Sequence, residues 1–302
     1  MYISNRKTLT IGIPAHNEEK NIGLLLKTII EQNCDIFVLK KIIVACDGCS
    51  DKTAAIVENL ARQKKVIQVI NDGKRLGKNS RLNNFYRCID TDVFLSFDAD
   101  IKISDRNLLN KVIYAFSDNK VGLVGGRVVP VFQKNLVGKA VAVYEDFWSR
   151  VIRSINKGNN VHSHTGPISA GKRDFLKNVI IPNDLPDDHY LYFSAHKAGF
   201  KYNYAKNATV YIKVPTTFDD YMKQSTRFID SGEEIRKYFG KWTEKHYYIP
   251  YYKKARAYLL TFLKHPVYLL IAIILVLLQK MLRNRYSRKN INGLWTPIAS
   301  SK

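Results

Sequence analysis

The chain has 302 residues, of which 46% are hydrophobic, and this composition excludes an intrinsically disordered protein and allows one large core or two smaller ones. Its 48 Lys and Arg residues against 26 Asp and Glu residues give a formal net charge of +22. Such an excess predicts an anionic partner, and charge alone leaves a nucleotide, a nucleic acid and a lipid surface open.

The N-terminal part of the chain alternates between strand and helix patterns. Runs of apolar, largely β-branched residues predict strands over residues 9–14, 41–46, 66–71 and 93–98. Helices are expected over residues 20–32, from about Asp51 with Ser50 or Asp51 as its cap, and after Gly77. Continuous apolar strands separated by helices are typical of an α/β fold with a mostly parallel sheet and helices on both faces.

All four cysteines lie in the first third of the chain, and Cys46 and Cys49 form a single C-x-x-C. A structural zinc site needs a second pair of ligands, so neither a zinc nor a redox role is expected. Residues 1–15 contain no long apolar segment and no small-residue cleavage pattern. No signal peptide is therefore expected, and the chain is predicted to work from the cytoplasm.

Polar and acidic residues follow three of the predicted strands. The first strand leads into PAHNEE (14–19), the second into CDGCSD with Asp47 and Asp51, and the last into DAD with Asp98 and Asp100. Ligands of such sheets bind outside the carboxyl ends of the strands. These residues are therefore expected to converge on one binding site.

Asp98 and Asp100, with one residue between them, suit a hard divalent cation. Two protein oxygens leave several coordination positions for waters and for the phosphate oxygens of a ligand. In isolation such a pair is more often part of a turn or a helix cap. At the end of a strand opposite Asp47 it predicts a site for Mg²⁺ or Mn²⁺.

Two other segments resemble known ligand-binding motifs but lack features that those motifs need. GKRLGKNS (73–80) resembles a phosphate-binding P-loop, but three residues separate Gly73 from Gly77 where four are needed, and Asn79 replaces Ser or Thr. His162 and His164 could be metal ligands at alternate positions of a strand. They have no third ligand at an obvious spacing, so we do not expect a metal there.

Residues 258–282 contain an unbroken apolar run, residues 266–278, between the basic segments YYKKAR and RNRYSRK. The run is shorter than the roughly 20 residues of a typical spanning helix, although flanking Lys side chains can snorkel. A single membrane span, a deep interfacial helix and a buried core helix all remain open. Basic residues on both sides leave the orientation undetermined.

Taken in order, IPAHNEEKNI, VACDGCSDKTAAIV, GKNSRLN and SFDAD resemble the family-2 glycosyltransferases, whose catalytic domain has the Rossmann-like GT-A fold. LPDDHYLYFSAHKAGFK (185–201) resembles the segment that carries the family's catalytic base. QSTRF (224–228) is similar to the Q-x-x-R-W motif of its processive membrane synthases. The resemblance covers about residues 8–240, and it implies a catalytic domain over residues 1–240 followed by membrane-associated helices, interfacial or transmembrane, over residues 241–302.

The resemblance also implies roles for individual residues. Those it assigns to the substrates are Pro14, Ala15, His16, Glu18, Asp47, Lys78, Asp98, Asp187, Gln224 and Arg227. The first four would line the nucleotide pocket, and Asp47 would reach the uracil ring. Asp98 and Asp100 would hold the metal and the diphosphate, and Asp188 would be the catalytic base.

The implied activity is metal-dependent, inverting transfer of a hexose from a nucleotide sugar, preferably a UDP-sugar, to a hydroxyl of a membrane-proximal acceptor. The acceptor would be lipid-linked or a polysaccharide of the cell envelope, reached from the cytoplasmic face of the membrane. The chain departs from the family pattern at Phe228, where the synthases have Trp, and at Asp187, where Glu is usual. Its one C-terminal apolar segment favours transfer of one or a few sugars over polymer synthesis with a partner subunit.

Two other classes of function are weighed against this enzyme. A noncatalytic module of the same fold could hold a nucleotide sugar or bind anionic lipids, but the intact Asp98, Asp100 and Asp188 argue against it. A nucleic-acid binder would share the positive charge. No recognition helix, zinc-finger spacing or RNP-like strand supports that class, so no nucleic-acid partner is expected.

Overall fold

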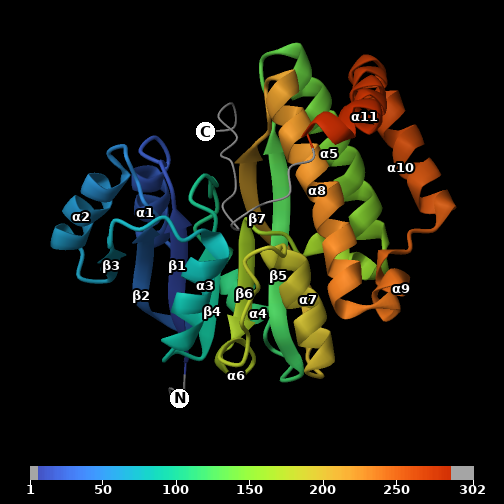
Figure 1. Cartoon of the computed structure of the whole chain (residues 1–302). Coiled ribbons are helices and arrows are strands. Elements are labelled where there is room, and N and C mark those ends of the chain that lie inside the picture. Colours follow the sequence, from blue (N-terminus) through green and yellow to red (C-terminus); the bar gives the residue numbers. More distant parts are fainter. Residues whose placement is uncertain (1–5, 287–302) are drawn as a thin grey trace.

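The computed structural model describes residues 6–286, apart from the side chain of Ser231. The chain folds around a seven-stranded sheet with the strand order β3-β2-β1-β4-β6-β5-β7 (Figure 1). The strands are β1 (Lys7–Ala15), β2 (Phe37–Cys46), β3 (Ile67–Ile70), β4 (Val93–Phe97), β5 (Val121–Val131), β6 (Ile168–Lys172) and β7 (Lys201–Lys213). The four strands expected from the sequence correspond to β1 to β4.

The sheet is mostly parallel, as expected, with one strand that the sequence did not reveal as an exception. β1 pairs in parallel with β2 and β4, β2 with β3, and β5 with β7. β6 runs antiparallel to both β4 and β5. Because β6 is reversed, the loop before it lies at the edge where β4 ends, and the backbone N–H of Asp98 donates to the Pro167 carbonyl at 3.3 Å.

Helices cover both faces of the sheet, which confirms the α/β class. The α-helices are α1 (Ile22–Ile30), α2 (Thr53–Gln63), α3 (Lys78–Arg87), α4 (Leu108–Tyr114), α5 (Leu136–Ser154), α6 (Arg173–Leu176), α7 (Asp187–Lys197), α8 (Phe218–Phe239), α9 (Glu244–Tyr247), α10 (Tyr251–Lys264) and α11 (Pro266–Tyr286). The 3₁₀ helices are η1 (Asn156–Gly158), η2 (Val161–Ser163) and η3 (Lys241–Thr243). The expected cap of α2 is wrong by one residue, because its N-cap is Lys52, although Asp51 Oδ1 still accepts the Thr53 N–H at 2.9 Å.

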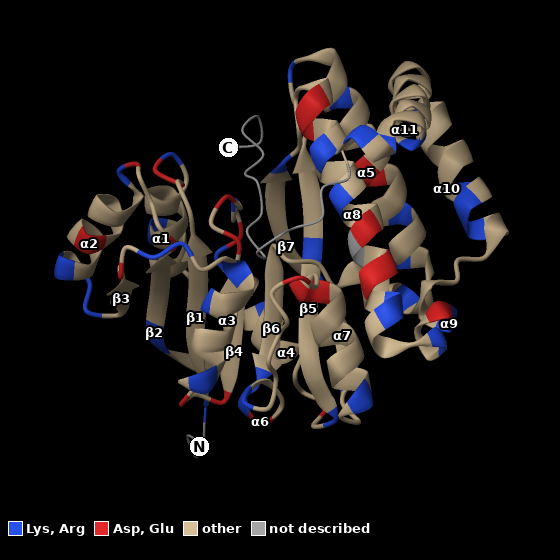
Figure 2. Cartoon of the chain, viewed as in Figure 1, with Lys and Arg blue, Asp and Glu red and all other residues tan. Residues whose placement is uncertain are grey.

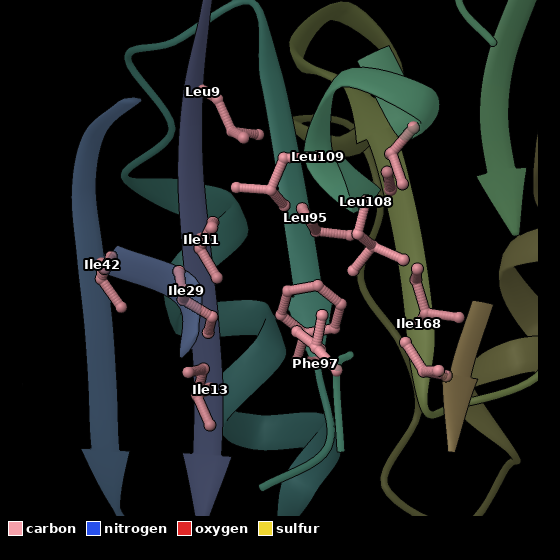
Figure 3. Close-up of a cluster of buried hydrophobic side chains, with 14 of the residues drawn as sticks. Leu9, Ile11, Ile13, Ile29, Ile42, Leu95, Phe97, Leu108, Leu109 and Ile168 are labelled. Carbon is pink, nitrogen blue, oxygen red and sulfur yellow. The ribbon is translucent and has the colours of Figure 1, made fainter. Parts of the chain in front are cut away.

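Two apolar clusters hold the helices on the sheet. The first joins β1, β2 and β4 to α1, α2 and α4, and Figure 3 shows Leu95 and Phe97 of β4 beside Leu108 of α4. The second joins the opposite face to α3, α6 and α7 through Leu82, Phe175 and Leu191. The sheet is therefore buried on both faces, and its strand ends are held rigidly.

The C-terminal helices lie at the side of the sheet, around α5 (Figure 1). α8 ends at Gly240, whose φ of 88° is the left-handed conformation that glycine adopts without strain. The division expected between residues 240 and 241 stays a prediction. Beyond it, α10 packs on α5, and α11 packs on both α5 and α8.

Candidate active site

The ends of β1 and β2 bring the first group of predicted residues together. Pro14 and Ala15 are the last two residues of β1 and pair with the end of β2. His16 follows them, and its Nδ1 donates to the backbone carbonyl of Asp47 at 2.8 Å. Glu18 is buried, and its carboxylate accepts the side-chain amide of Asn21 at 2.8 Å, at the start of α1.

Asp47 is buried and organises the entry to α3. Its carboxylate accepts the backbone N–H groups of Leu76 at 2.7 Å and Gly77 at 3.0 Å. It also accepts the Arg81 Nε at 2.9 Å, and the same guanidinium pairs with Asp72 at 2.7 Å. These contacts fix the loop that precedes Lys78, and a contact with uracil stays a prediction.

Arg81 is a residue whose role the sequence reasoning missed. It is the largest fully buried side chain among the described residues, and it lies within the quoted GKNSRLN segment. Its spacing of three residues from Lys78 places both on one side of a helix, which was the available signal. Its partner Asp47, more than thirty residues away, could not be inferred from spacing.

A second group forms around Lys78 at the N-terminus of α3. Its Nζ lies 2.7 Å from Asp98 Oδ1 and 3.0 Å from Asp187 Oδ2. Burial opposes the charge on Lys78, but the carboxylates of Asp187 and Asp98 outweigh it and raise the pKa of the ammonium. Burial also raises the pKa of Asp187, against the effect of Lys78. We call these three residues the Lys78 cluster.

Arg227 of α8 faces the same carboxylates. Burial lowers the pKa of its guanidinium, and the negative charges of Asp98, Asp188, Asp187 and Asp100 oppose that effect. Gln224 lies on α8 one turn before Arg227 and is half-buried. The structure thus brings β4, α3, α7 and α8 to one charged site.

Gly166 lies directly against the Lys78 cluster. A Cβ atom at this position would lie 2.7 Å from Lys78 Nζ and 3.4 Å from Asp98 Oδ2. Only glycine lets the ammonium lie between its two carboxylates without a collision. No sequence pattern indicates this contact, because the loop of Gly166 reaches the site only through the reversed strand β6.

His164 contacts the segment of the predicted base. The side chain is fully buried, its Nδ1 lies 2.7 Å from the backbone oxygen of Asp188, and its Nε2 lies 2.9 Å from Ser169 Oγ. A carbonyl oxygen only accepts, so Nδ1 carries the proton. Burial lowers the pKa of His164 to about 4, so the neutral ring accepts the Ser169 hydroxyl at Nε2.

Asp187 and Asp188 have different surroundings although they are neighbours. Asp187 is buried in the Lys78 cluster, whereas Asp188 is half-buried and its Oδ1 accepts the His189 N–H at 2.7 Å. Asp188 is therefore the more accessible of the two carboxylates.

The residues at the end of β4 fit a divalent cation only in part. Between residues 6 and 286, no three His, Cys, Asp or Glu side chains are grouped to hold a metal. Asp98 and Asp100 offer hard oxygen ligands, but Asp98 Oδ1 already pairs with Lys78. The pair suits a cation that takes its remaining ligands from a diphosphate and water.

Cys46 and Cys49 are free thiols beside the first group. Cys49 Sγ donates to the Ala15 carbonyl at 3.3 Å. A hydrogen bond from Cys46 lowers the pKa of Cys49 to about 6.

Two surface hollows lie outside this charged site. One of about 330 Å³ is lined by His196, Lys197, Tyr238, Phe239 and Trp242. The other, of about 430 Å³, lies between α3 and the segment around Pro182. Neither is lined by the Lys78 cluster or Arg227, and we locate the candidate site by its converging charges.

The chain is similar to known proteins in sequence and in fold. The family model described as glycosyl transferase family 2 matches residues 10–180. The 4,4'-diaponeurosporenoate glycosyltransferase of Staphylococcus aureus is 35% identical over 111 residues, which are 36% of this chain and 28% of that protein. The match thus spans under a third of that relative's length.

Solved structures are similar in fold. Mannosyltransferase PcManGT from Pyrobaculum calidifontis, in complex with GDP-Man and Mn²⁺, has a TM-score of 0.60 at 19% identity, covering 92% of this chain and 76% of that one. S. aureus TarS 1-349 in complex with UDP-GlcNAc has a TM-score of 0.50 at 15% identity, covering 74% of this chain and 65% of that one.

Proposed function

Because the chain belongs to glycosyl transferase family 2, we propose that it is an inverting, metal-dependent hexosyltransferase that uses a nucleotide-sugar donor. The donor is a UDP-sugar, and the acceptor is a hydroxyl of a membrane-proximal, lipid-linked or polysaccharide molecule at the cytoplasmic face of the membrane. Residues 1–240 form the catalytic unit, and residues 241–302 the membrane-associated region.

The proposal rests on one observation above all. Lys78, Asp98, Asp187 and Arg227 come from four separate elements and meet at the carboxyl end of β4, with Asp100 and Asp188 beside them. A site that holds both positively charged side chains and carboxylates suits a diphosphate leaving group together with a hydroxyl nucleophile. A noncatalytic pocket has no need of Asp188.

Each residue has a defined part in the reaction. Asp188 accepts the proton of the attacking hydroxyl, and attack opposite the leaving group inverts the anomeric centre. Lys78 and Arg227 lie where they can stabilise the negative charge that develops on the diphosphate. A divalent cation held by Asp98 and Asp100 would add Lewis-acid stabilisation of that diphosphate. PcManGT, crystallised with GDP-Man and Mn²⁺, supports a cation of this kind.

The test is single-turnover sugar transfer by the folded Asp188→Asn protein, with donor affinity measured in parallel. The substitution keeps the shape of the side chain and removes proton acceptance, so transfer should fall by about 10²- to 10⁴-fold while donor affinity barely changes. The donor is first found by incubating tagged nucleotide sugars with membrane extract.

Asp187→Asn is the matched comparison, because Asp187 belongs to the Lys78 cluster and should change donor affinity as well. Near-normal transfer by Asp188→Asn would exclude Asp188 as the base. Wild-type protein that binds a donor but never releases its nucleotide would instead indicate the noncatalytic module.

A further inference from the structure

α11 carries two opposite stripes of side chains. Leu269, Ala272, Leu275 and Gln279 are buried, whereas Val267, Leu270, Ile274, Leu277 and Met281 are between 51% and 78% exposed. At 100° per residue the two stripes point roughly 180° apart. The exposed stripe runs along the whole helix and is entirely apolar.

α10 extends this apolar surface. Its exposed large side chains include Tyr258, Leu259, Leu260, Phe262 and Leu263. We call these residues and the exposed stripe of α11 the α10–α11 face. Many exposed apolar side chains on two consecutive helices that contact each other mark a site of interaction with a partner or a membrane.

The charge of this segment identifies the partner. Residues 251–286 contain seven Lys and Arg residues and no Asp or Glu, so Figure 2 shows blue and no red on α10 and α11. Arg256, Lys264 and Lys280 are exposed near the apolar residues. An apolar face bordered only by positive charge is complementary to an anionic lipid leaflet.

The buried stripe determines how α11 meets the lipid. Leu275 and Ala272 pack with Met222 of α8, and Gln279 donates to Thr226 Oγ1 at 3.5 Å. Near its end, Arg283 pairs with Asp230 at 2.7 Å and Glu233 at 3.0 Å. α11 is therefore attached to α8 along most of its length.

α8 cannot enter a bilayer. Its charged residues are Asp219, Asp220, Lys223, Arg227, Asp230, Glu233, Glu234, Arg236 and Lys237. α11 is about 32 Å long, enough to cross a hydrocarbon core. Crossing would either draw those charges into the hydrocarbon or strip α11 from its packing, and each charge at the bilayer centre costs about 3 kcal/mol.

We propose that the α10–α11 face docks on an anionic membrane with α10 and α11 lying in the plane of one leaflet, and that α11 does not span the bilayer. The sequence left a spanning, an interfacial and a core helix open. The interfacial arrangement keeps the buried stripe packed on the protein and places the exposed apolar stripe in lipid. It deepens the proposed function, because it identifies the surface that brings the site to a membrane-proximal acceptor.

The test is an aspartate scan of vesicle binding by the full chain. Val267→Asp, Ile274→Asp and Met281→Asp place one charge at the start, middle and end of the exposed stripe. Partition into vesicles of equimolar phosphatidylcholine and phosphatidylglycerol is measured by sedimentation. In-plane docking puts the three positions at one depth, so each variant should bind about 10- to 100-fold more weakly. Leu24→Asp on α1, which is as exposed as Val267, is the control and should leave binding unchanged.

Every outcome of the scan decides the proposal. Losses that peak sharply at Ile274 and are small at both ends would indicate a span and overturn it. Unchanged vesicle binding in all three variants would also overturn it, and a change in oligomeric state by sedimentation velocity would then identify a second copy as the occupant. No sugar transfer is measured, so this result and the test of the proposed function can fail separately.

A separate observation concerns His164, whose ring joins the sheet to the first turn of α7. Its Nδ1 donates to the Asp188 carbonyl at 2.7 Å, and Ser169, at the other nitrogen, is part of β6. Tyr202 packs against the ring edge to face, at 5.4 Å between ring centroids. The ring therefore links the backbone of Asp188 to β6. Because β6 pairs with β4, this link also fixes Asp188 relative to Asp98, which follows β4.

We infer that His164 is a positioning residue that acts on transfer through Asp188, an inference that rests on the proposed function. His164→Leu removes both hydrogen bonds and should lower kcat about 10- to 100-fold without changing donor affinity. His164→Asn keeps a donor near the Nδ1 position and should restore part of the rate. Tyr202→Phe, which keeps the aromatic contact and loses only the hydroxyl, is the control for stability alone.

The deciding measurement is a double-mutant cycle with Asp188→Asn. If His164 acts through Asp188, His164→Leu has little further effect in the Asp188→Asn protein. A full effect in both backgrounds would reduce His164 to a stability role and overturn this inference only. Normal transfer by Asp188→Asn itself would overturn both this inference and the assignment of the base.

Discussion

At the scale of single residues, Gly166 makes the sharpest test of the Lys78 cluster. In Gly166→Ala the new methyl group would lie 2.7 Å from Lys78 Nζ and would push the ammonium away from Asp98 and Asp187. We expect donor turnover to fall at least about tenfold, as for loss of a positioned charge in a site. The melting temperature should change little, because a lysine side chain can move aside.

Gly232→Ala on α8 is the matched control. Its Cβ would meet nothing closer than 3.9 Å, so helix propensity alone should make the protein slightly more stable. Equal turnover by both alanine variants would show that the position of Lys78 does not matter for the reaction.

Cys49 offers a chemical probe of the proposed nucleotide pocket. The hydrogen bond from Cys46 lowers the pKa of Cys49 to about 6, so its share of reactive thiolate is larger than that of an ordinary cysteine. Iodoacetamide should therefore alkylate Cys49 faster than Cys34, which is equally half-buried but whose pKa is raised by burial. Mass spectrometry of the two peptides measures the ratio, and bound UDP should slow the reaction at Cys49. Equal rates at the two cysteines would contradict the lowered pKa.

At the scale of helices and strands, the two stripes of α11 predict opposite responses to the same substitution. Leu275 is 7% exposed and packs with α5 and α8, whereas Leu277 is 53% exposed. Leu275→Ala should lower the free energy of unfolding by about 2–5 kcal/mol in urea titrations. Leu277→Ala should leave it within about 0.5 kcal/mol and weaken vesicle binding instead. Equal costs in solution would place both side chains in the core.

The same packing limits what a truncation can show. Removing the chain from Tyr258 onward would take away α11 and uncover Val141, Tyr221 and Met222. Loss of membrane binding by such a protein would not separate lipid contact from damage to the core. Point substitutions on the exposed stripe avoid this ambiguity.

The strands and helices differ in how far the sequence could predict them. Each of β1 to β4 has a clear apolar run in the sequence. The alternation of these strands with helices, and the acidic residues that follow the strands, were therefore predictable. β6 pairs with β4 across more than seventy residues and in the reverse direction, and no local pattern encodes such a pairing. The contacts of Gly166 and His164 depend on β6, which is why spacing alone gave the histidine no role.

At the scale of the whole molecule, the buried His164 predicts a loss of stability in acid. Burial lowers its pKa to about 4 from the ordinary value near 6.5, so below pH 6.5 the unfolded chain binds a proton that the folded chain does not. Stability is complete above that pH, and up to about 3 kcal/mol is lost as the pH falls from 6.5 to 4. Urea unfolding across this range measures it, and the His164→Asn protein should have a shallower slope. An identical slope would assign the acid sensitivity to other groups.

α8 connects the candidate active site with the α10–α11 face. Thr226 contacts α11, and the next residue, Arg227, faces the carboxylates around Lys78. A ligand that orders Arg227 therefore also biases the helix against which α11 is packed. By thermodynamic reciprocity, if a lipid surface tightens donor binding, donor must tighten attachment to that surface by the same factor. Such an enzyme would bind the sugar donor most tightly while it is attached to a membrane. It would also attach to the membrane more weakly when no donor is bound.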